Sequence, residues 1–123
     1  MINKTPTKRY HLILDFIKVD KKYLNDKNFL ERLIISVSKV IKMNILYGPV
    51  VIEGGKHNPG LSAFCIIDYS HISVHTFSKE REFCFDVFSC KKFDGVKLEK
   101  HLTKTLKASQ NKVFIIRPKY ERK

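Results

Sequence analysis

Polar side chains of the kinds that can do chemistry are concentrated between residues 62 and 90, in sequence that otherwise has the pattern of strands. The cluster contains serine, histidine, threonine, cysteine and aspartate: Ser62, Ser70, His71, Ser73, His75, Thr76, Cys84, Asp86, Ser89 and Cys90. A polar group in a buried strand costs free energy unless it is hydrogen bonded. This concentration therefore indicates a functional site, although an amphipathic sheet with polar edges would have the same composition.

A single metal ion fits this cluster poorly. His71 and His75 are four residues apart in an expected strand, which places them roughly 13 Å apart, too far for one zinc ion. The Cys-x-x-Cys pairs of a structural zinc site are also absent from the sequence. We therefore expect no metal.

A cysteine nucleophile is a second reading of the cluster. Cys90 could be activated by His75 if the two lay opposite each other on adjacent strands, about 5 Å apart. The alternative is that Cys65, Cys84 and Cys90 are small buried hydrophobic residues. Because Cys65 has apolar neighbours on both sides, we prefer the buried interpretation for it. For Cys90 the pattern leaves both readings open.

The elements that must position these residues follow from the spacing of apolar side chains. We expect strands at 10–19, 50–53, 62–69, 71–77, 82–89 and 113–117, and helices at 25–41 and 94–108. Asn25 and Asp26 are typical caps for the first helix, and Gly48-Pro49 is expected to break the chain before the short strand at 50–53. The main elements follow in the order β-α-β-β-β-α-β, which defines an α+β fold.

Two helices can cover only one face of such a sheet. The segment 10–19 carries apolar side chains on both of its faces, which is typical of a strand covered from both sides. Something must therefore lie against the second face. A partner sheet in a homodimer is the simplest candidate.

Composition limits the classes of protein to consider. With 123 residues, 43% of them apolar, the chain is expected to form one domain, 1–123, and not a disordered protein. The 24 Lys and Arg against 12 Asp and Glu give a net charge of +12, which attracts nucleic acid, acidic membranes or another anionic partner. No helix-turn-helix, zinc finger or aromatic RNA-binding signature accompanies that charge, so nucleic acid is an unlikely partner.

The cellular compartment is inferred from three further features. No apolar run approaches the roughly 18 residues of a transmembrane helix, so we expect no membrane span. The first ten residues are polar and lack the apolar region of a signal peptide. Three cysteines is an odd number, which suits reduced thiols in the cytoplasm.

Two segments of the polar cluster resemble the small prokaryotic S-adenosylmethionine decarboxylases. They are Tyr-Ser-His-Ile-Ser-Val-His-Thr-Phe (69–77) and Phe-Asp-Val-Phe-Ser-Cys (85–90), where that family has Glu-Ser-His-x-x-x-His-Thr-Trp-Pro-Glu and Asp-Val-Phe-x-Cys. The spacings from Ser70 to His75 and from Ser70 to Cys90 match, and Ser62 matches a further serine. The resemblance covers nearly the whole chain and implies the fold of that family, with sheets paired in a homodimer.

The resemblance implies a self-processing enzyme with a pyruvoyl cofactor. The hydroxyl of Ser70 would attack the carbonyl of Tyr69 and turn the amide into an ester, with strain at the turn favouring the step. Ser62 would help to hold the oxyanion, and His75 would remove the α-proton of Ser70. The ester then leaves by elimination, and the product hydrolyses to a pyruvoyl group.

Cleavage would give a β chain, 1–69, and an α chain, 70–123, that begins with the pyruvoyl group generated from Ser70. The ketone of this group condenses with a substrate amine and accepts the electrons released with CO2. Cys90 matches the general acid that returns a proton to the substrate. The resemblance thus implies a pyruvoyl-dependent carboxy-lyase.

Three departures from the family bear on cleavage and on the substrate. Tyr69 replaces the family's Glu before the serine, which should leave cleavage intact because only the backbone carbonyl takes part. Lys79 replaces a Glu that holds the ribose of S-adenosylmethionine, although Glu80 is next to it. His57 takes the place of an adenine-stacking Phe. We expect His57, Lys79 and Glu80 to bind the substrate.

The first expectation for the substrate is S-adenosylmethionine, whose decarboxylation supplies aminopropyl groups for spermidine synthesis. Decarboxylation of L-arginine or L-ornithine on the same fold is an alternative. A second alternative is a non-enzymatic basic relative that binds anions or nucleic acid. Salt-dependent binding without chain cleavage would favour that last alternative.

Overall fold

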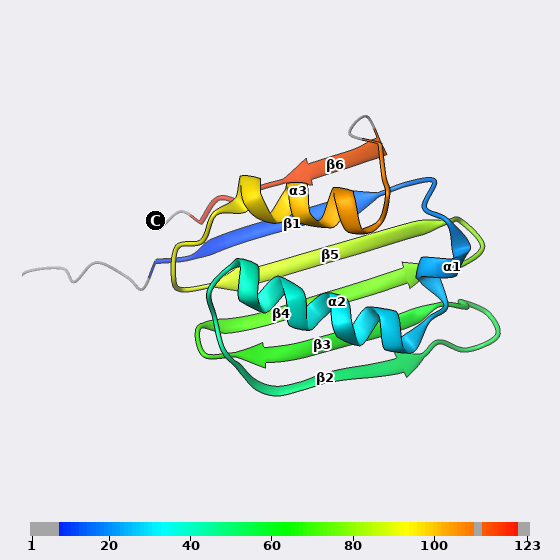
Figure 1. Cartoon of the computed structure of the whole chain (residues 1–123), viewed down its shortest axis with the longest axis horizontal. Helices are drawn as coiled ribbons and strands as arrows, with labels where there is room; N and C mark the ends of the chain where they lie inside the picture. The colour runs from blue at the N-terminus through cyan, green and yellow to red at the C-terminus, as the bar shows by residue number, and fades with distance from the viewer. Residues whose placement is uncertain (1–7, 110–111, 121–123) are drawn as a thin grey trace, which may run out of the picture.

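The computed structural model describes residues 8–109 and 112–120, which form one antiparallel six-stranded sheet and its helices (Figure 1). In chain order the elements are β1 (Tyr10–Phe16), α1 (Lys21–Leu24), α2 (Lys27–Val40), β2 (Ile45–Glu53), β3 (Leu61–Ile67), β4 (Ser70–Phe77), β5 (Glu82–Ser89), α3 (Gly95–Thr105) and β6 (Val113–Ile116). The architecture is α+β, as expected.

The strands lie in the order β2-β3-β4-β5-β1-β6. β2 to β5 follow one another as hairpins, and β1 then pairs with the far side of β5. The expected order β-α-β-β-β-α-β counts one strand too few for the six expected segments, all of which lie in the sheet. The segment expected at 50–53 is the end of the nine-residue strand β2. The chain is not broken at Gly48-Pro49, where a cis peptide bond and a register shift are accommodated inside β2.

Side-chain caps decide where the two long helices begin. The carboxylate of Asp26 accepts a hydrogen bond from the backbone N–H of Phe29 at 3.0 Å, and that of Asp94 does the same for Lys97. These starts agree with the expected ones. The first strand is shorter than expected, because it ends at Phe16 and Asp20 caps the short helix α1 that follows.

The core lies between the helices and one face of the sheet. Alternate residues of β1 and β5 point into it, and Leu14, Phe16, Phe83 and Phe85 are completely buried. Burial of each such side chain stabilises the fold by about 1.5–3 kcal/mol. The apolar stripes of α2 and α3 cover these residues, so the helical periodicity and the strand alternation meet in one core.

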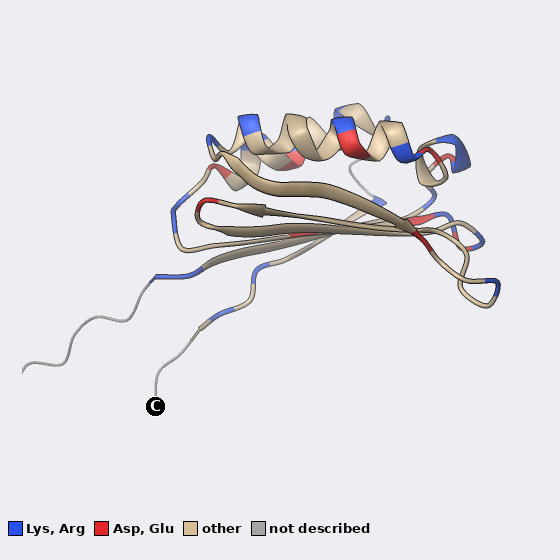
Figure 2. Ribbon diagram, turned by 90° about the horizontal axis from the view of Figure 1, so that it is seen from below, with Lys and Arg blue, Asp and Glu red and all other residues tan. Residues whose placement is uncertain are grey.

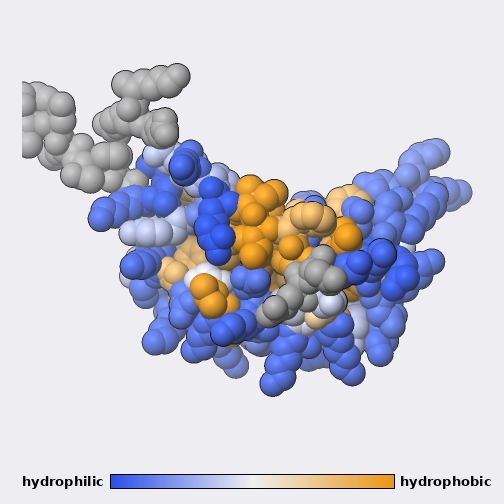
Figure 3. Space-filling view, turned by 90° about the horizontal axis from the view of Figure 1, so that it is seen from above, coloured by the Kyte–Doolittle hydropathy of each residue, from blue (hydrophilic) through white to orange (hydrophobic). Residues whose placement is uncertain are grey.

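The opposite face of the sheet, which we call the open face, carries no helix or strand within residues 8–109 and 112–120 (Figure 2). Its residues include His11, Ile13 and Asp15 of β1, because their neighbours point into the core. A view from the β6 edge shows hydrophobic side chains in a patch bordered by hydrophilic ones (Figure 3). At that edge Phe114 and Ile116, the register partners of Asp15 and Ile13, are exposed.

Candidate active site

Ser70 occupies a strained position at the start of β4. Asp68 and Tyr69 form the two-residue turn between β3 and β4, and Ser70 follows with a φ of +149°. A residue with a side chain rarely adopts such a φ, and strained backbone of this kind costs of order 1–3 kcal/mol. The peptide bond between Tyr69 and Ser70 is therefore under local strain.

The carbonyl of that peptide bond has a hydrogen-bond donor in place. The backbone N–H of Cys90 donates to the carbonyl oxygen of Tyr69 at 3.0 Å. The pairing of Ser70 with Ser89 across β4 and β5 sets this contact. A fixed donor at a carbonyl oxygen stabilises the negative charge that develops when a nucleophile attacks the carbonyl carbon.

The turn and the adjacent end of β5 are held by contacts that the sequence analysis did not predict. Asn44 donates its backbone and side-chain N–H groups to the carboxylate of Asp68, at 3.1 and 3.0 Å. The hydroxyl of Ser89, completely buried, accepts from the backbone N–H of Lys91 at 2.9 Å and donates to its carbonyl oxygen at 2.8 Å. No sequence signal marks Asn44, which is 24 residues from its partner.

The ring of Tyr69, which replaces the family's Glu, also has a partner. The ammonium group of Lys91 lies 5.0 Å from the centroid of this ring. Such a cation–π contact contributes about 0.5–1 kcal/mol at an exposed site. We call Tyr69, Ser70 and Cys90 the cleavage end of the sheet.

A second polar group lies at the other end of β4. The hydroxyl of Ser62 and Nδ1 of His75 are 2.9 Å apart, because the two residues are register partners in β3 and β4. Both side chains are exposed. The hydrogen bond orients the imidazole of His75 and leaves Nε2 available for proton transfer.

The expected substrate-binding residues lie at the same end as His75. Loop 54–60 precedes β3 and turn 78–81 follows β4, and the backbone N–H of Ser78 donates to the carbonyl oxygen of Pro59 at 3.2 Å. His57, Lys79 and Glu80 are all exposed in these two segments. We call the group of Ser62, His75, His57, Lys79 and Glu80 the histidine end.

One chain does not bring the two ends together. Ser70 and His75 are five residues apart on the same strand, a separation of roughly 16 Å. The expectation that Cys90 lies opposite His75 is wrong, because the register partner of His75 in β5 is Cys84. The sequence pattern could not reveal this, since the register depends on the length of the turn between β4 and β5.

The three cysteines have distinct surroundings. Cys65 is completely buried, and burial raises the pKa of its thiol to about 11, which confirms the interpretation of Cys65 as a core residue. Burial, followed by the charges of Asp15, Asp86 and Glu82, raises the pKa of the Cys84 thiol. Cys90 is the exposed one.

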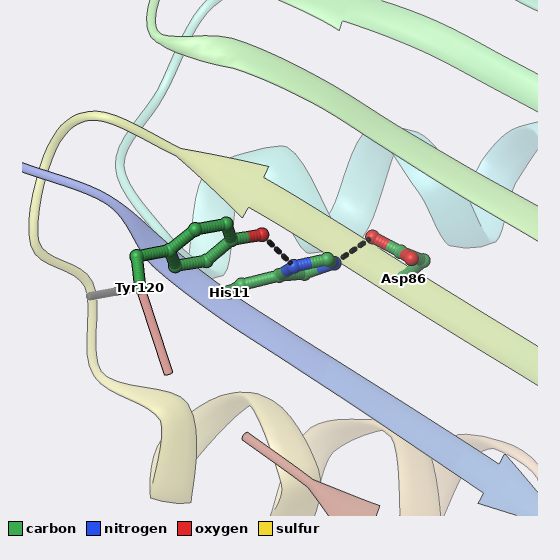
Figure 4. Close-up of polar contacts among 3 residues, drawn as sticks. All are labelled: His11, Asp86 and Tyr120. Carbon is green, nitrogen blue, oxygen red and sulfur yellow. Dashed lines mark hydrogen bonds and ion pairs between the residues drawn. The ribbon is translucent and has the colours of Figure 1, made fainter. Parts of the chain in front are cut away.

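The sequence analysis also did not predict the contacts of a polar cluster on the open face. Nδ1 of His11 is 2.6 Å from the hydroxyl of Tyr120, and its Nε2 is 2.9 Å from a carboxylate oxygen of Asp86 (Figure 4). The ring of Phe88 makes an edge contact with the ring of His11 and stacks on that of His71. His71 follows Ser70 directly, so this cluster is continuous with the cleavage end.

Neither a metal site nor a membrane span is found in the described part of the chain. Residues 8–109 and 112–120 contain no group of three or more His, Cys, Asp or Glu side chains placed to hold a metal ion. None of the helices in these residues is long and apolar enough to cross a membrane.

The fold is shared with a solved structure. The chain superposes on the crystal structure of the adenosylmethionine decarboxylase from Aquifex aeolicus with a TM-score of 0.75, over 93% of this chain and 91% of that one, at 16% sequence identity. At this identity the likeness concerns the fold alone.

Sequence comparison then identifies the family. The family model of S-adenosylmethionine decarboxylase matches residues 10–118, and the chain belongs to this family of pyruvoyl-dependent decarboxylases. It is also 29% identical over 80 residues to the arginine decarboxylase proenzyme of Caldivirga maquilingensis. That match covers 65% of this chain and spans 60% of the length of that relative.

Proposed function

We propose that the chain is one self-processing domain that cleaves itself between Tyr69 and Ser70 and then decarboxylates an amino acid. The observation that carries the proposal is the geometry of the cleavage end. Ser70 has a φ of +149°, and the carbonyl of Tyr69 accepts the N–H of Cys90. Residues 1–69 become the β chain and residues 70–123 the α chain.

The cleavage step uses groups that are already placed. The hydroxyl of Ser70 attacks the carbonyl carbon of Tyr69, and the Cys90 N–H stabilises the charge on the carbonyl oxygen. The amide becomes an ester as the nitrogen of Ser70 is released and takes up a proton. This rearrangement relieves the strained φ of Ser70.

His75 is assigned the next proton transfer. Its imidazole removes the α-proton of Ser70, and the ester then leaves as the carboxylate of Tyr69. Ser62, hydrogen bonded to Nδ1 of His75, orients the ring so that Nε2 acts as the base. Within its own chain, Ser62 acts only by orienting His75. The resemblance also implies that Ser62 holds the oxyanion at the Tyr69 carbonyl, and this role requires the Ser62 of a second chain.

A homodimer would bring the cleavage end of one chain next to the histidine end of another. The open face has exposed apolar residues, including Phe64, Ile66 and Ile116, and a partner sheet packed on it would bury them. When two sheets pack about a two-fold axis in antiparallel orientation, the cleavage end of one chain meets the histidine end of the other. Each site is then built from Ser70 and Cys90 of one chain and Ser62 and His75 of its partner.

The pyruvoyl group supplies a ketone that condenses with the substrate amine and accepts the electron pair released with CO2. Cys90 returns a proton from Sγ to the α-carbon of the substrate. His57, Lys79 and Glu80 reach the substrate from the histidine end. Among these three, Glu80 carries the negative charge that can accept hydrogen bonds from hydroxyls or bind a cation.

S-Adenosylmethionine is the proposed substrate. Its decarboxylation would supply aminopropyl groups for spermidine synthesis, and the protein would act in the cytoplasm. Family membership over residues 10–118 supports it. The similarity to an arginine decarboxylase proenzyme favours arginine as the second candidate. Release of CO2 from S-adenosylmethionine, arginine and ornithine, measured in parallel on the cleaved protein, distinguishes the substrates.

Mass spectrometry of the purified protein tests self-processing. We expect two fragments, 1–69 and 70–123, the second lacking the α-amino group and reacting with a carbonyl-trapping reagent. Ser70→Ala should give an intact chain, whereas Ser73→Ala, on the same strand, should cleave normally. An intact wild-type chain after long incubation, or cleavage of Ser70→Ala, would refute the proposal.

A further inference from the structure

A basic cavity of about 640 Å³ lies at the end of the molecule where α2 ends and α3 begins. Its lining combines cationic and apolar residues: Val40, Ile41, Lys42, Lys91, Lys92, Phe93, Asp94, Gly95, Val96, Lys97 and Arg117. The volume is within the range of about 300–1,000 Å³ that small-molecule sites have. Lys91 also contacts the Tyr69 ring at the cleavage end, but none of the lining residues is assigned a step of cleavage or decarboxylation.

The charge of the cavity is not compensated. Four lysines and one arginine line it, whereas Asp94 is the one acid, and its carboxylate accepts from the backbone N–H of Lys97. Within residues 8–109 and 112–120, no carboxylate lies within ion-pairing distance of any of these five cations. Like charges lining a hollow with low-dielectric walls concentrate the field and attract an anion.

The apolar part of the lining narrows the class of anion. Val96 is 55% exposed at the first turn of α3, and Phe93 is half-buried beside it with one side packed on the core. An inorganic anion would leave these surfaces in water. A ligand with a flat apolar ring and a multiply charged chain would use both parts of the lining.

We propose that this cavity binds a nucleoside polyphosphate, with the phosphates among the five cations and the base against Val96 and Phe93. The cations line one local hollow, which favours a small ligand over a nucleic acid, whose phosphates would be spaced along an extended surface. Binding requires no cleavage of the chain, so this inference stands apart from the proposed decarboxylase activity. The chain carrying Ser70→Ala should bind as the wild type does.

Isothermal titration calorimetry of the full chain at low ionic strength tests the proposal, with ATP, tripolyphosphate, adenosine and a single-stranded RNA as probes. We expect saturable binding of one ATP per chain, with weaker binding of tripolyphosphate and of adenosine. Phe93→Leu should weaken ATP binding and leave tripolyphosphate binding unchanged. The affinity for ATP should fall as salt is added.

Charge reversal at the cavity has a matched control. Lys92→Glu with Lys97→Glu should lower the affinity for ATP by roughly tenfold or more. Lys21→Glu with Lys22→Glu makes the same change in net charge on α1, at the opposite end of the sheet (Figure 1), and should leave the affinity unchanged. Arg117→Gln changes a cation outside α3 and should also weaken ATP binding. This variant tests the proposal if the chain with both lysines of the cavity reversed does not fold.

Several results would overturn the proposal. They are no saturable ATP binding, equal losses in both charge-reversed pairs, or tripolyphosphate that binds as tightly as ATP. RNA that binds while ATP neither binds nor competes would assign the basic surface to nucleic acid instead.

Discussion

Cys90 contributes to the cleavage end through two different groups. Its backbone N–H donates to the Tyr69 carbonyl, while its thiol is exposed and is the proposed proton donor. A side-chain substitution removes the second group and keeps the first. In the proposed mechanism, the requirements of cleavage and of decarboxylation at this residue can therefore be tested separately.

Cys90→Ala should cleave as the wild type does and decarboxylate more slowly, by about 10²–10⁴-fold, the usual contribution of a general acid. Cys65→Ala is the control, because the Cys65 thiol is completely buried in the core and cannot reach a substrate. The rate of CO2 release and the masses of the fragments measure the two effects. Normal turnover in Cys90→Ala would exclude its thiol as the donor.

At the same scale, the sequence offered candidate residues but not the contacts around them. Ser70, His75 and Cys90 were singled out by a local motif that resembles the family's, and their roles stay predictions. Asn44, Ser89 and Lys91 were given no role, because the contacts that hold the turn join separate elements. The pairing of Cys90 with His75 was wrong for the same reason, since it depended on register.

At the scale of the elements, the start of β3 is fixed to β4 by a close backbone approach. Gly60 has a φ of +148°, and a Cβ placed on it would lie 1.9 Å from the carbonyl oxygen of Thr76. The hydroxyl of Thr76 accepts from the N–H of Leu61 and donates to the carbonyl of Leu24, both at 2.8 Å. This junction positions the histidine end, because His75 precedes Thr76.

Gly60→Ala should destabilise the fold by more than about 1 kcal/mol, since both the φ and the space exclude a side chain. Gly55 is in the same loop and would meet nothing within 4 Å, so Gly55→Ala should change the free energy of unfolding by less than about 0.5 kcal/mol. Urea unfolding followed by circular dichroism compares the two. Equal stability of the two variants would contradict the close approach.

The contact between α2 and α3 should make stability depend on pH. Nε2 of His101 is 2.8 Å from the hydroxyl of Ser36, and burial, then the charge of Lys104, lowers the pKa of His101 below its ordinary 6.5. The unfolded chain therefore binds the proton more tightly than the folded chain. Stability from this group is complete above pH 6.5 and is lost as the pH falls through the lower pKa of the folded state.

His101→Gln keeps a hydrogen-bond donor at this position and removes the titration. The loss of Tm between about pH 7.5 and about pH 5.5 should be smaller in the variant than in the wild type. All other titrating groups are common to both proteins and cancel in the comparison. An equal loss of Tm in the two proteins would show that His101 does not contribute.

The elements themselves were largely predictable. Caps at Asp26 and Asp94 and the apolar periodicity located both long helices, because these signals act within one turn of chain. β2 was underestimated, since Gly48 and Pro49 usually end a strand and only the pairing with β3 keeps them in the sheet. The sequence pattern carries no signal for that pairing, so the Gly-Pro pair was taken as the end of the preceding segment.

At the scale of the whole molecule, the open face remains to be explained. The sequence indicated a second cover for the sheet because the segment 10–19 is apolar on both sides, and the structure places no helix or strand there within the described residues. The separation of the cleavage end from the histidine end gives an independent reason for a partner. Both reasons lead to the same arrangement, two sheets packed face to face.

Complementation between two inactive variants tests this arrangement directly. Ser70→Ala lacks the cleaved residue, and His75→Ala lacks the base, so neither should form pyruvoyl-capped 70–123 alone. When the two are co-expressed with different tags, a mixed dimer contains one complete site, built from Ser70 of the His75→Ala chain and His75 of the Ser70→Ala chain. With random assembly about half of the His75→Ala chains enter mixed dimers and should carry the pyruvoyl group, as measured by mass spectrometry.

The double variant carrying both substitutions on one chain is the matched control for that experiment. Co-expressed with His75→Ala, it still supplies no base, so it cannot complete a site, whereas Ser70→Ala can. If the pyruvoyl group forms only when the partner chain carries His75, the proton transfer crosses the interface. Failure of purified mixed dimers, carrying both tags, to form the pyruvoyl fragment would contradict a site shared between two chains. Within one chain the roughly 16 Å between the two ends of the paired strand β4 keeps His75 away from Ser70.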